Sequence, residues 1–308
     1  GCGAECNTLY LRDENMILCV GEILADMFGS TVNGVFSYER NAGGAPFNVA
    51  CAIKKFGGSS VFVGNVGDDA IGKFLVDFAV GRGLDECYVT LDEKRNTTLA
   101  FVELDESGER SFCFYRKNTA DYHLPEIPEK IWSKAKMVVV GSLMLSENEG
   151  FAYAEKLIER AKQAGKEIAF DVNFRSDVFS CKDEAIERYK SIIEKADVLK
   201  LSSEETEIFG EAYLRSLKDK LICVSLGKAG SVCLFGEEKY AVPSVKVTPV
   251  DTTGAGDAFF AGFLTKLPAV KSERTAKSIT DALLFGNVCG ALTTRAKGAI
   301  DEIGRAHV

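Results

Sequence analysis

The sequence predicts an α/β sandwich, in which helices cover a mostly parallel central sheet. Short continuous apolar runs alternate with stretches of helical periodicity over most of the 308 residues, and continuous apolar strands are typical of sheets buried on both faces. A strand, a helix and a strand in repetition favour right-handed parallel crossovers. Two segments with the pattern of antiparallel hairpins interrupt this order, so we also expect a small second sheet.

Six apolar runs are predicted to form the main strands. They lie at 17–20, 61–63, 137–140, 167–170, 198–201 and 221–224. Helical periodicity predicts helices at 45–56, 147–164, 183–195 and 258–267, and glycines directly after the first two mark their ends. A hairpin over 231–235 and 239–242 is expected to extend one edge of the sheet.

The two interrupting segments are predicted to build a small sheet that projects from the main one. Asn33-Gly34 stands between β-forming residues, which is a strong hairpin signal. The runs 97–102 and 111–115 alternate around a turn at 105–108. We place these lid hairpins at about 27–40 and 97–118, where they would serve as a lid over a site, as a dimer surface, or as both.

Composition and charge exclude several classes of protein. With 46% hydrophobic and 27% charged residues, the chain has the composition of an ordinary soluble globular protein. Its formal net charge of −8 opposes binding to nucleic acid or to an anionic membrane surface. The longest mostly apolar run, 137–145, is far shorter than the roughly 20 residues of a membrane-spanning helix. Ten cysteines without a C-x-x-C pair indicate reduced thiols and a cytoplasmic location.

The first fifteen residues and the histidines also narrow the possibilities. Residues 1–15 are polar and have neither the apolar core nor the basic start of a signal peptide, so we interpret them as an N-terminal extension or leader. The chain has only two histidines, His123 and His307. Mechanisms that need a histidine base or several histidine metal ligands therefore have little support, and catalysis has to use carboxylates, basic side chains or backbone groups.

The most informative segment runs from Asp251 to Asp257 and reads Asp-Thr-Thr-Gly-Ala-Gly-Asp. Small residues just before a helix let unpaired backbone amides face an anion, and the helix dipole adds to the attraction. Asp257 would fall in the first turn, where its carboxylate could accept a proton from a hydroxyl that attacks a phosphoryl group. The alternative is a glycine-rich turn with an Asp favoured at a helix start.

A second segment, 41–48, joins a loop to a helix near the N-terminus. The glycine pair Gly43-Gly44 permits close backbone approach to a ligand. Asn48 lies roughly one turn further on and can both donate and accept hydrogen bonds, as sugar hydroxyls require. Asp26, after the first strand, offers a carboxylate for two vicinal hydroxyls. A turn glycine pair and a capping Asp are the simpler interpretations of these residues.

Together these segments resemble the ribokinase-like, or phosphofructokinase-B type, family of sugar kinases. The resemblance rests on two signatures, which occur in the same order as in the family. The first lies at 43–50 and is followed by Gly-Asn-Val-Gly-Asp-Asp at 64–69, and the second lies at 251–257. It covers roughly 16–300. It implies a Mg-ATP-dependent kinase of a sugar hydroxyl, with a Rossmann-type three-layer α/β sandwich over 16–308 and a small β-sheet lid.

The resemblance also assigns roles by position. Asp257 resembles the catalytic base, and the amides of Gly254, Ala255 and Gly256 resemble the anion hole for the transferred phosphoryl group. Positions that resemble the family's sugar contacts are Asp26, Gly43, Gly44, Asn48, Phe101, Arg116, Asn173 and Arg175. Positions that resemble its ATP-binding residues are Lys200, Glu205, Ser225, Gly227, Gly230 and Asn287.

Metal sites are implied in the same way. Glu205 matches the acidic residue of the family's Asn-x-x-Glu motif, which is linked to Mg²⁺ and phosphate positioning, although Ser202 takes the place of the asparagine. Asp251 and Thr253 match a monovalent-cation site of many members. The cofactors implied are ATP and Mg²⁺, with K⁺ as an optional third.

The choice of sugar rests on finer likenesses. Gly-Gly-Ala-Pro-x-Asn and the lid segments 97–102 and 114–121 resemble fructokinases, which implies conversion of fructose to fructose 6-phosphate. The run 171–175 resembles a stretch shared with 2-keto-3-deoxygluconate kinases. That keto acid, or another keto or deoxy sugar, is the alternative substrate, and Arg116 and Arg175 would then clamp its carboxylate.

The remaining expectations concern partners and a second class of function. The partners implied are the sugar, ATP and a second copy of the chain in a homodimer, with no nucleic acid and no membrane. A sugar or nucleotide sensor without catalytic activity is the alternative from another class. The presence of both Asp257 and Glu205 disfavours it.

Overall fold

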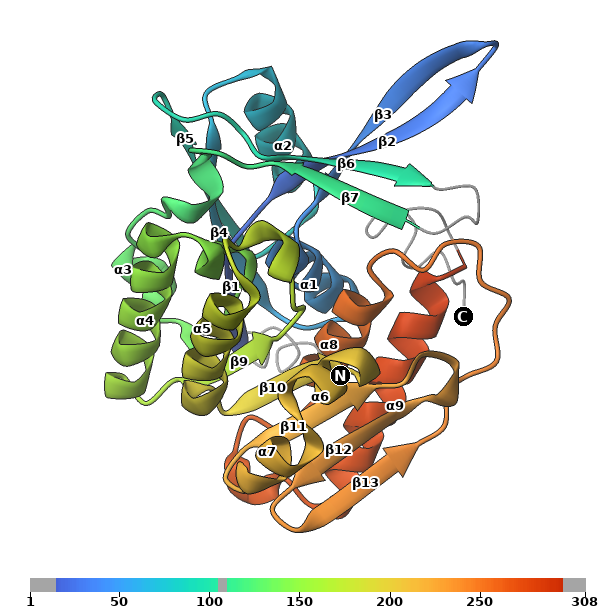
Figure 1. The fold of residues 1–308 in the computed structure, drawn as a ribbon. Helices are drawn as coiled ribbons and strands as arrows, with labels where there is room; N and C mark the ends of the chain where they lie inside the picture. The colour runs from blue at the N-terminus through green and yellow to red at the C-terminus, as the bar shows by residue number, and fades with distance from the viewer. Residues whose placement is uncertain (1–14, 105–109, 296–308) are drawn as a thin grey trace, which may run out of the picture.

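The computed structural model describes residues 15–104 and 110–295. Nine strands form the main sheet in the order β13-β12-β11-β10-β9-β8-β1-β4-β5, in which every neighbouring pair from β11 to β5 is parallel (Figure 1). In chain order, the strands are β1 (Met16–Val20), β4 (Ser60–Gly67), β5 (Glu86–Asp92), β8 (Ala135–Val140), β9 (Glu167–Asp171), β10 (Val198–Ser202), β11 (Leu221–Ser225), β12 (Ser231–Phe235) and β13 (Glu238–Val242).

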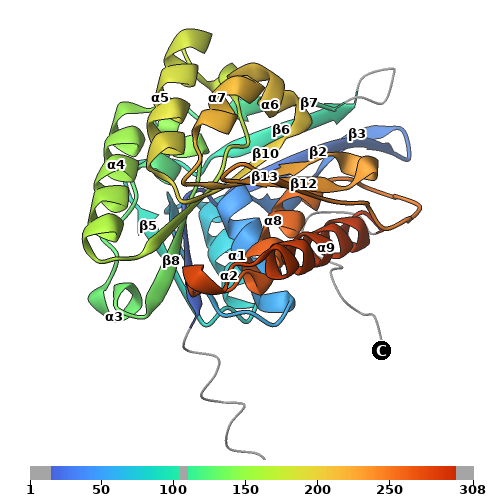
Figure 2. The same ribbon diagram turned by 90° about the horizontal axis from the view of Figure 1, so that it is seen from below.

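Helices cover both faces of this sheet, which gives the three layers expected from the sequence (Figure 2). The buried core on one face includes side chains of α1 (Ala45–Lys55), α2 (Ala70–Val80), α8 (Ala255–Lys266) and α9 (Ala276–Thr293). The core on the other face includes side chains of α3 (Glu129–Trp132), α4 (Asn148–Gln163), α5 (Lys182–Lys195), α6 (Ser203–Phe209) and α7 (Glu211–Ser216). The predicted α/β fold class is confirmed.

The six predicted central strands and the edge hairpin are all present, but the sequence analysis did not identify α2, β5 or α9. The start of α2 does carry a signal, because the Asp69 side chain accepts hydrogen bonds from the amides of Ile71 and Gly72 as an N-cap. The 18 residues of α9 have a weakly amphipathic pattern, since much of the helix circumference is buried. Periodicity is a poor guide for such a helix.

A separate four-stranded sheet has the order β3-β2-β6-β7. Its strands are β2 (Leu24–Val32), β3 (Val35–Gly43), β6 (Leu99–Leu104) and β7 (Arg110–Tyr115), and the β2–β3 hairpin projects from the main body in Figure 1. Asn33 and Gly34 both have positive φ at its tip, as the hairpin signal requires. The two hairpins join through parallel pairing of β2 with β6. The turn expected at 105–108 and most of the expected leader lie outside the described residues.

Two smaller expectations can be compared with this structure. No helix within the described ranges is long and apolar enough to cross a membrane. The eight cysteines in the described part of the chain are free thiols, and Cys19, Cys223, Cys233 and Cys289 are buried as their apolar surroundings suggested.

Candidate active site

The start of α8 presents backbone amides at the carboxyl end of the parallel strands. Gly254 is the N-cap with φ of 72°, a left-handed conformation that favours glycine. Within the described residues, the amides of Gly254, Gly256 and Asp257 form no hydrogen bond, whereas the Ala255 amide donates to the Thr252 carbonyl oxygen over 3.2 Å. Of the amides expected to form the anion hole, those of Gly254 and Gly256 are available in the described residues and that of Ala255 is not, while the Asp257 amide is an additional available donor.

Asp257 lies in the first turn of α8 and is held by the other motif. The Asn48 Nδ2 donates to Asp257 Oδ2 over 2.8 Å, across 209 residues of sequence. Because Asn48 is buried on α1, this bond fixes one carboxylate oxygen and leaves the second oxygen for a ligand. The two signature segments thus meet at one side chain.

Burial raises the pKa of Asp257 above the ordinary value of an aspartate. The hydrogen bond from Asn48 and the positive charges of Lys200 and Arg175 act in the opposite direction and lower it. A carboxylate that is poorly solvated but still ionised is a better proton acceptor than one in water. The surroundings of Asp257 therefore favour a general base.

Lys200 connects this base with a buried acid on the neighbouring strand. Its Nζ lies 3.0 Å from Asp171 Oδ1, and both side chains are buried. Burial and the negative charges of Asp257 and Glu205 raise the pKa of Asp171 to about 7, although Lys200 opposes the shift. A Cβ added at Gly256 would lie 2.9 Å from Lys200 Nζ, so the ammonium group lies close to the start of α8.

Glu205 uses both carboxylate oxygens on backbone amides. Its Oε1 accepts from Phe174 N over 2.5 Å, and its Oε2 accepts from Ser202 N over 2.7 Å. Ser202 is the N-cap of α6 and completes a capping box with Glu205. Both oxygens thus have backbone partners, and the indirect link of Glu205 to Mg²⁺ that the resemblance implies stays a prediction. Glu205 ties the loop after β9 to the end of β10.

That loop carries Asn173 and Arg175. Asn173 has φ of 37°, a conformation that non-glycine residues rarely adopt. The Arg175 guanidinium carbon lies 5.8 Å from the ring centre of Phe112 on β7, and its charge lowers the pKa of Asp257. The tethered loop therefore brings Arg175 between the small sheet and the base.

The expected sugar contacts lie where the small sheet meets the main one. Asp26 on β2 stands directly beside Gly43, because a Cβ added there would lie 2.1 Å from Asp26 Oδ2. Gly44 has φ of 114° and lies so close to the Glu22 carbonyl oxygen that a Cβ would be 2.4 Å from it. Both glycines thus allow a close approach to other parts of the protein, whereas the predicted close approach to a ligand stays a prediction. They let α1 begin directly against the loop after β1.

Phe101 does not face these residues. In the register of the small sheet Asp26 pairs with Ala100 and Met27 pairs with Phe101, so Phe101 lies on the face opposite to Asp26. Its ring makes edge contacts with Tyr38 and Tyr115, at centroid distances of 4.8 and 5.2 Å. The geometry gives Phe101 a packing role, and we do not retain it among the sugar contacts.

Arg116 directly follows β7 and is deeply buried. Its Nε donates to Asp121 Oδ2 over 2.7 Å and its Nη1 donates to Ser146, while Nη2 has no hydrogen-bond partner in the described residues. Asp121 also accepts from the hydroxyls of Thr98 and Thr119. Arg116 is therefore held rigidly on two nitrogens and offers the third.

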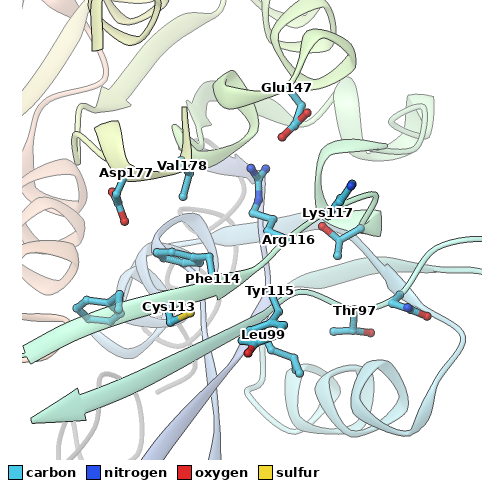
Figure 3. A pocket seen from close by; sticks show the side chains of 13 residues that line it. Thr97, Leu99, Cys113, Phe114, Tyr115, Arg116, Lys117, Glu147, Asp177 and Val178 are labelled. Atoms are coloured by element: carbon cyan, nitrogen blue, oxygen red, sulfur yellow. The ribbon is translucent and has the colours of Figure 1, made fainter. Parts of the chain in front are cut away.

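Arg116 lines a cavity of about 820 Å³ beside β7 (Figure 3). Its guanidinium group lies near Glu147, and Asp177 and Val178 lie across the cavity from Phe114 (Figure 3). Phe114 pairs with Ala100, so it lies on the same face of the small sheet as Ala100 and Asp26. The cavity thus adjoins the side of the small sheet on which the sugar contacts lie.

The residues expected on the nucleotide side are bonded mainly to backbone. Gly227 and Gly230 have positive φ in the turn between β11 and β12, and a Cβ at Gly230 would lie 2.1 Å from the Val242 carbonyl oxygen. Asn287 on α9 is buried and donates from Nδ2 to the carbonyls of Val242 and Pro243, each over 3.2 Å. Ser225 donates to the Leu201 carbonyl oxygen. Together these bonds shape a backbone turn at the end of the sheet.

The two residues expected to bind a monovalent cation, Asp251 and Thr253, belong to one tight turn. Asp251 Oδ1 accepts from both the amide and the hydroxyl of Thr253, over 2.8 and 2.7 Å. The Asp251 amide in turn donates to Thr294 after α9. These bonds fix the loop that leads into the anion site.

Sequence reasoning missed three buried acids, Glu22, Asp121 and Asp171, as site residues. Three buried side-chain atoms around this site have neither a hydrogen bond nor an ion pair in the described residues: Glu22 Oε2, Asn48 Oδ1 and Arg116 Nη2. Asp121 lies in a polar stretch of the sequence, but Glu22 and Asp171 follow or end hydrophobic segments, and buried charges of this kind are rare without a function. The position of Glu22 and Asp171 beside hydrophobic segments was the signal in the sequence that could have identified them as site residues.

Comparison with known proteins agrees with this geometry. The model of the pfkB family of carbohydrate kinases matches residues 14–304. The chain belongs to the pfkB family of carbohydrate kinases. It is 38% identical to a probable fructokinase-7 of Arabidopsis thaliana, over 95% of this chain and 91% of the relative, and 36% identical to fructokinase-1 of Oryza sativa subsp. japonica, over 94% of each.

Solved structures extend the comparison to three dimensions. The ATP-bound fructokinase of Xylella fastidiosa has a TM-score of 0.85 at 30% identity and covers 93% of this chain and 94% of its own. The fructokinase of Vibrio cholerae O395 with fructose, ADP and calcium has a TM-score of 0.83 at 30% identity, over 94% and 95%. The expected carbohydrate kinase fold and enzyme class are therefore confirmed.

Proposed function

We propose that this pfkB family kinase is a fructokinase, which transfers the γ-phosphoryl group of ATP to the 6-hydroxyl of fructose. The observation that supports the proposal is the junction of Asp257 with Asn48, because a carboxylate suited to the role of general base lies there beside three amides without a partner in the described residues. The relatives named fructokinase over nearly the full chain support the choice of sugar.

The proposed reaction follows from this junction. ATP lies along the carboxyl ends of the parallel strands with its γ-phosphate at the start of α8. The fructose hydroxyl oxygen forms a bond to the γ-phosphorus while the bond to the β,γ-bridging oxygen breaks, ADP leaves, and the hydroxyl proton passes to Asp257. The free amides of Gly254, Gly256 and Asp257, with Lys200 beside them, stabilise the charge on the transferred group.

Mg²⁺ would fit beside the acidic residues near Lys200. Phosphate oxygens and water would supply most of its ligands. Within the described ranges, no three metal-ligating side chains are close enough to form a metal site by themselves, and Mg²⁺ commonly needs only one or two carboxylates. The buried carboxylate of Asp171, which forms an ion pair with Lys200, is the candidate ligand, and the ion would neutralise phosphate charge. K⁺ at the Asp251–Thr253 turn is the corresponding proposal for a monovalent cation.

A 2-keto acid sugar is the second candidate substrate, because the site contains two arginines near the small sheet. Arg116 offers an unpartnered Nη2 and Arg175 lies over Phe112. A guanidinium with a free nitrogen suits a carboxylate as well as a hydroxyl. On this proposal, 2-keto-3-deoxygluconate would replace fructose in the same mechanism.

We further propose a homodimer formed through the small sheet. Phe36, Tyr38 and Tyr115 are 58%, 40% and 62% exposed and join Phe101 in a chain of edge contacts. Exposed aromatic clusters of this kind favour an interface. Light scattering should give twice the chain mass, and Phe36→Asp should reduce it to one chain.

The deciding experiment measures ATP-dependent ADP release with Mg²⁺ on fructose, 2-keto-3-deoxygluconate, ribose, tagatose and adenosine. The proposal expects kcat/KM for fructose to exceed that for each other substrate by at least about tenfold. Preference for the keto acid would establish the second candidate. Folded protein without turnover of any substrate would contradict both.

A further inference from the structure

Asp121 is a buried acid that the proposed reaction does not use. It lies in the short helix η2 (Ala120–Tyr122) and is 1% exposed. Its Oδ2 accepts a hydrogen bond from Arg116 Nε over 2.7 Å, and its Oδ1 accepts from the hydroxyls of Thr98 and Thr119 over 2.5 and 2.7 Å. Because both carboxylate oxygens have partners, the position of this negative charge is fixed.

Arg116 is the positive partner of Asp121 in a buried ion pair. The exposed fractions of the two side chains are 5% and 1%. Arg116 Nη1 also donates to Ser146, and the guanidinium carbon lies 5.0 Å from the ring centre of Tyr122. An arginine held in this way cannot turn toward another group without breaking these contacts. Asp121 therefore compensates the positive charge of Arg116 at the place where Arg116 meets the cavity.

The cavity in Figure 3 has a lining without an excess of positive charge. Its charged side chains among the described residues are Arg116 and Lys117 on one side of the balance, and Glu147 and Asp177 on the other. Asp121, bonded to Arg116, adds a further negative charge. The carboxylate of a sugar acid at Arg116 would be the second carboxylate on one guanidinium, and like charges close together repel. A neutral sugar avoids this repulsion.

We propose that Asp121 makes the site select a neutral sugar over a carboxylated one, because its carboxylate compensates the charge of Arg116. The proposal deepens the proposed function and rests on it, since it requires a sugar to bind beside Arg116. It separates fructose from 2-keto-3-deoxygluconate, the second candidate substrate. Asp121 acts through Arg116 and is thus a positioning residue.

The first test uses Asp121→Asn, which removes the charge and can keep the contacts. The new amide oxygen can accept from Arg116 Nε, and the amide nitrogen can donate to the hydroxyls of Thr98 and Thr119, which also serve as acceptors. Arg116 then lacks a counter-charge that a substrate carboxylate can supply. In ATP-dependent ADP release, the ratio of kcat/KM for 2-keto-3-deoxygluconate to kcat/KM for fructose should rise by at least about tenfold.

Two further variants show whether the charge of this pair is the cause. Asp77→Asn, at an exposed position of α2 outside the cavity lining, removes one negative charge elsewhere and should change the ratio by less than about twofold. Adding Arg116→Gln to Asp121→Asn should abolish the rise, because no positive charge is left to compensate. A merely structural role of Asp121 would lower kcat/KM for both substrates together and leave their ratio unchanged.

A second measurement needs no variant and covers the case in which Asp121→Asn does not fold. In the unaltered protein, 2-keto-3-deoxygluconate is added as a competitor while the formation of fructose 6-phosphate is followed at saturating ATP. The proposal expects an inhibition constant at least about tenfold above the KM for fructose. A smaller ratio of the two constants would overturn it.

The outcomes separate this inference from the function on which it rests. Absence of fructose turnover by the folded, unaltered protein would contradict the proposed function. Normal fructose turnover by the unaltered protein, together with an unchanged substrate ratio in folded Asp121→Asn, would overturn the role of Asp121 alone.

Discussion

Two groups of polar side chains in the site find hydrogen-bond partners in different ways. We call Glu22, Asn48 and Arg116 the sugar half of the site, and Glu205 and Asn287 the nucleotide half. In the sugar half, Asn48, Arg116 and Glu22 each keep one buried atom that has no hydrogen-bond partner among the residues that the structure describes. In the nucleotide half, Glu205 and Asn287 each bond two backbone groups. Unpartnered buried groups cost free energy that a ligand can recover, whereas bonded ones stabilise the backbone. On the proposed function, this difference predicts that the sugar contacts mainly side chains and that the nucleotide contacts mainly backbone groups.

The largest expected effect tests the point where the two halves meet. Asp257→Asn removes the proton acceptor and should lower kcat by at least about 10²-fold, the scale of a lost general base. The KM for fructose should change much less, since the amide can still accept the Asn48 hydrogen bond. Steady-state ADP release checks both quantities, and a loss of kcat below about threefold would remove Asp257 from its role.

Removing Asn48 tests the sugar half. Asn48→Ala should lower kcat/KM for fructose by about 10-fold to 10²-fold, because it removes both a bond to the base and a free acceptor. The Asn48 hydrogen bond lowers the pKa of Asp257, so its loss raises that pKa. Since the base must be ionised, the acid limb of the pH profile of kcat/KM should move to higher pH. An unmoved limb would show that the bond does not tune the base.

Glu205 tests whether an acid of the nucleotide half acts through the backbone. Glu205→Gln can accept from only one of the two amides, so we expect a loss of about 1–3 kcal/mol in the free energy of unfolding and about tenfold in kcat. Denaturant unfolding and ADP release measure these changes, with the exposed neighbour Glu204→Gln as the control. Full rescue by excess Mg²⁺ without any loss of stability would instead identify Glu205 as a metal-linked residue.

The smallest effect is expected for Asn287. Asn287→Ala leaves two buried carbonyls with one partner fewer, so the KM for ATP should rise by about fivefold while the KM for fructose stays unchanged. Initial rates with each substrate varied in turn provide the measurement. A larger effect on fructose than on ATP would break the division of the site into two halves.

Much of this site could be predicted from the sequence because its parts are local. The glycines at 43–44 and 254 and the short spacing to Asp257 require one backbone geometry wherever they occur, and the structure has it. What could not be predicted are contacts between distant elements, such as the partners of Glu205 and the opposite faces of Phe101 and Asp26. These depend on strand register and loop closure, which local patterns do not specify.

The elements of the fold also separate into those that the sequence predicted and those that it did not. The main strands are continuous apolar runs and were predicted, whereas β5 mixes polar and apolar residues at a sheet edge and α9 lacks a clear apolar stripe. Glu22 is the most informative omission. A single acid directly after a fully buried strand marks a group that the fold keeps at a cost.

Fructose binding to the nucleotide-free protein and to two asparagine variants tests the central claim most directly. Asn48 and Asn287 are both buried amides, but of the two only Asn48 has a fully buried side-chain atom without a hydrogen-bond partner in the described residues. Calorimetry should show at least about tenfold weaker fructose binding in Asn48→Ala and less than about twofold in Asn287→Ala. Equal losses in the two variants, or a larger loss in Asn287→Ala, would contradict the division between a sugar half and a nucleotide half.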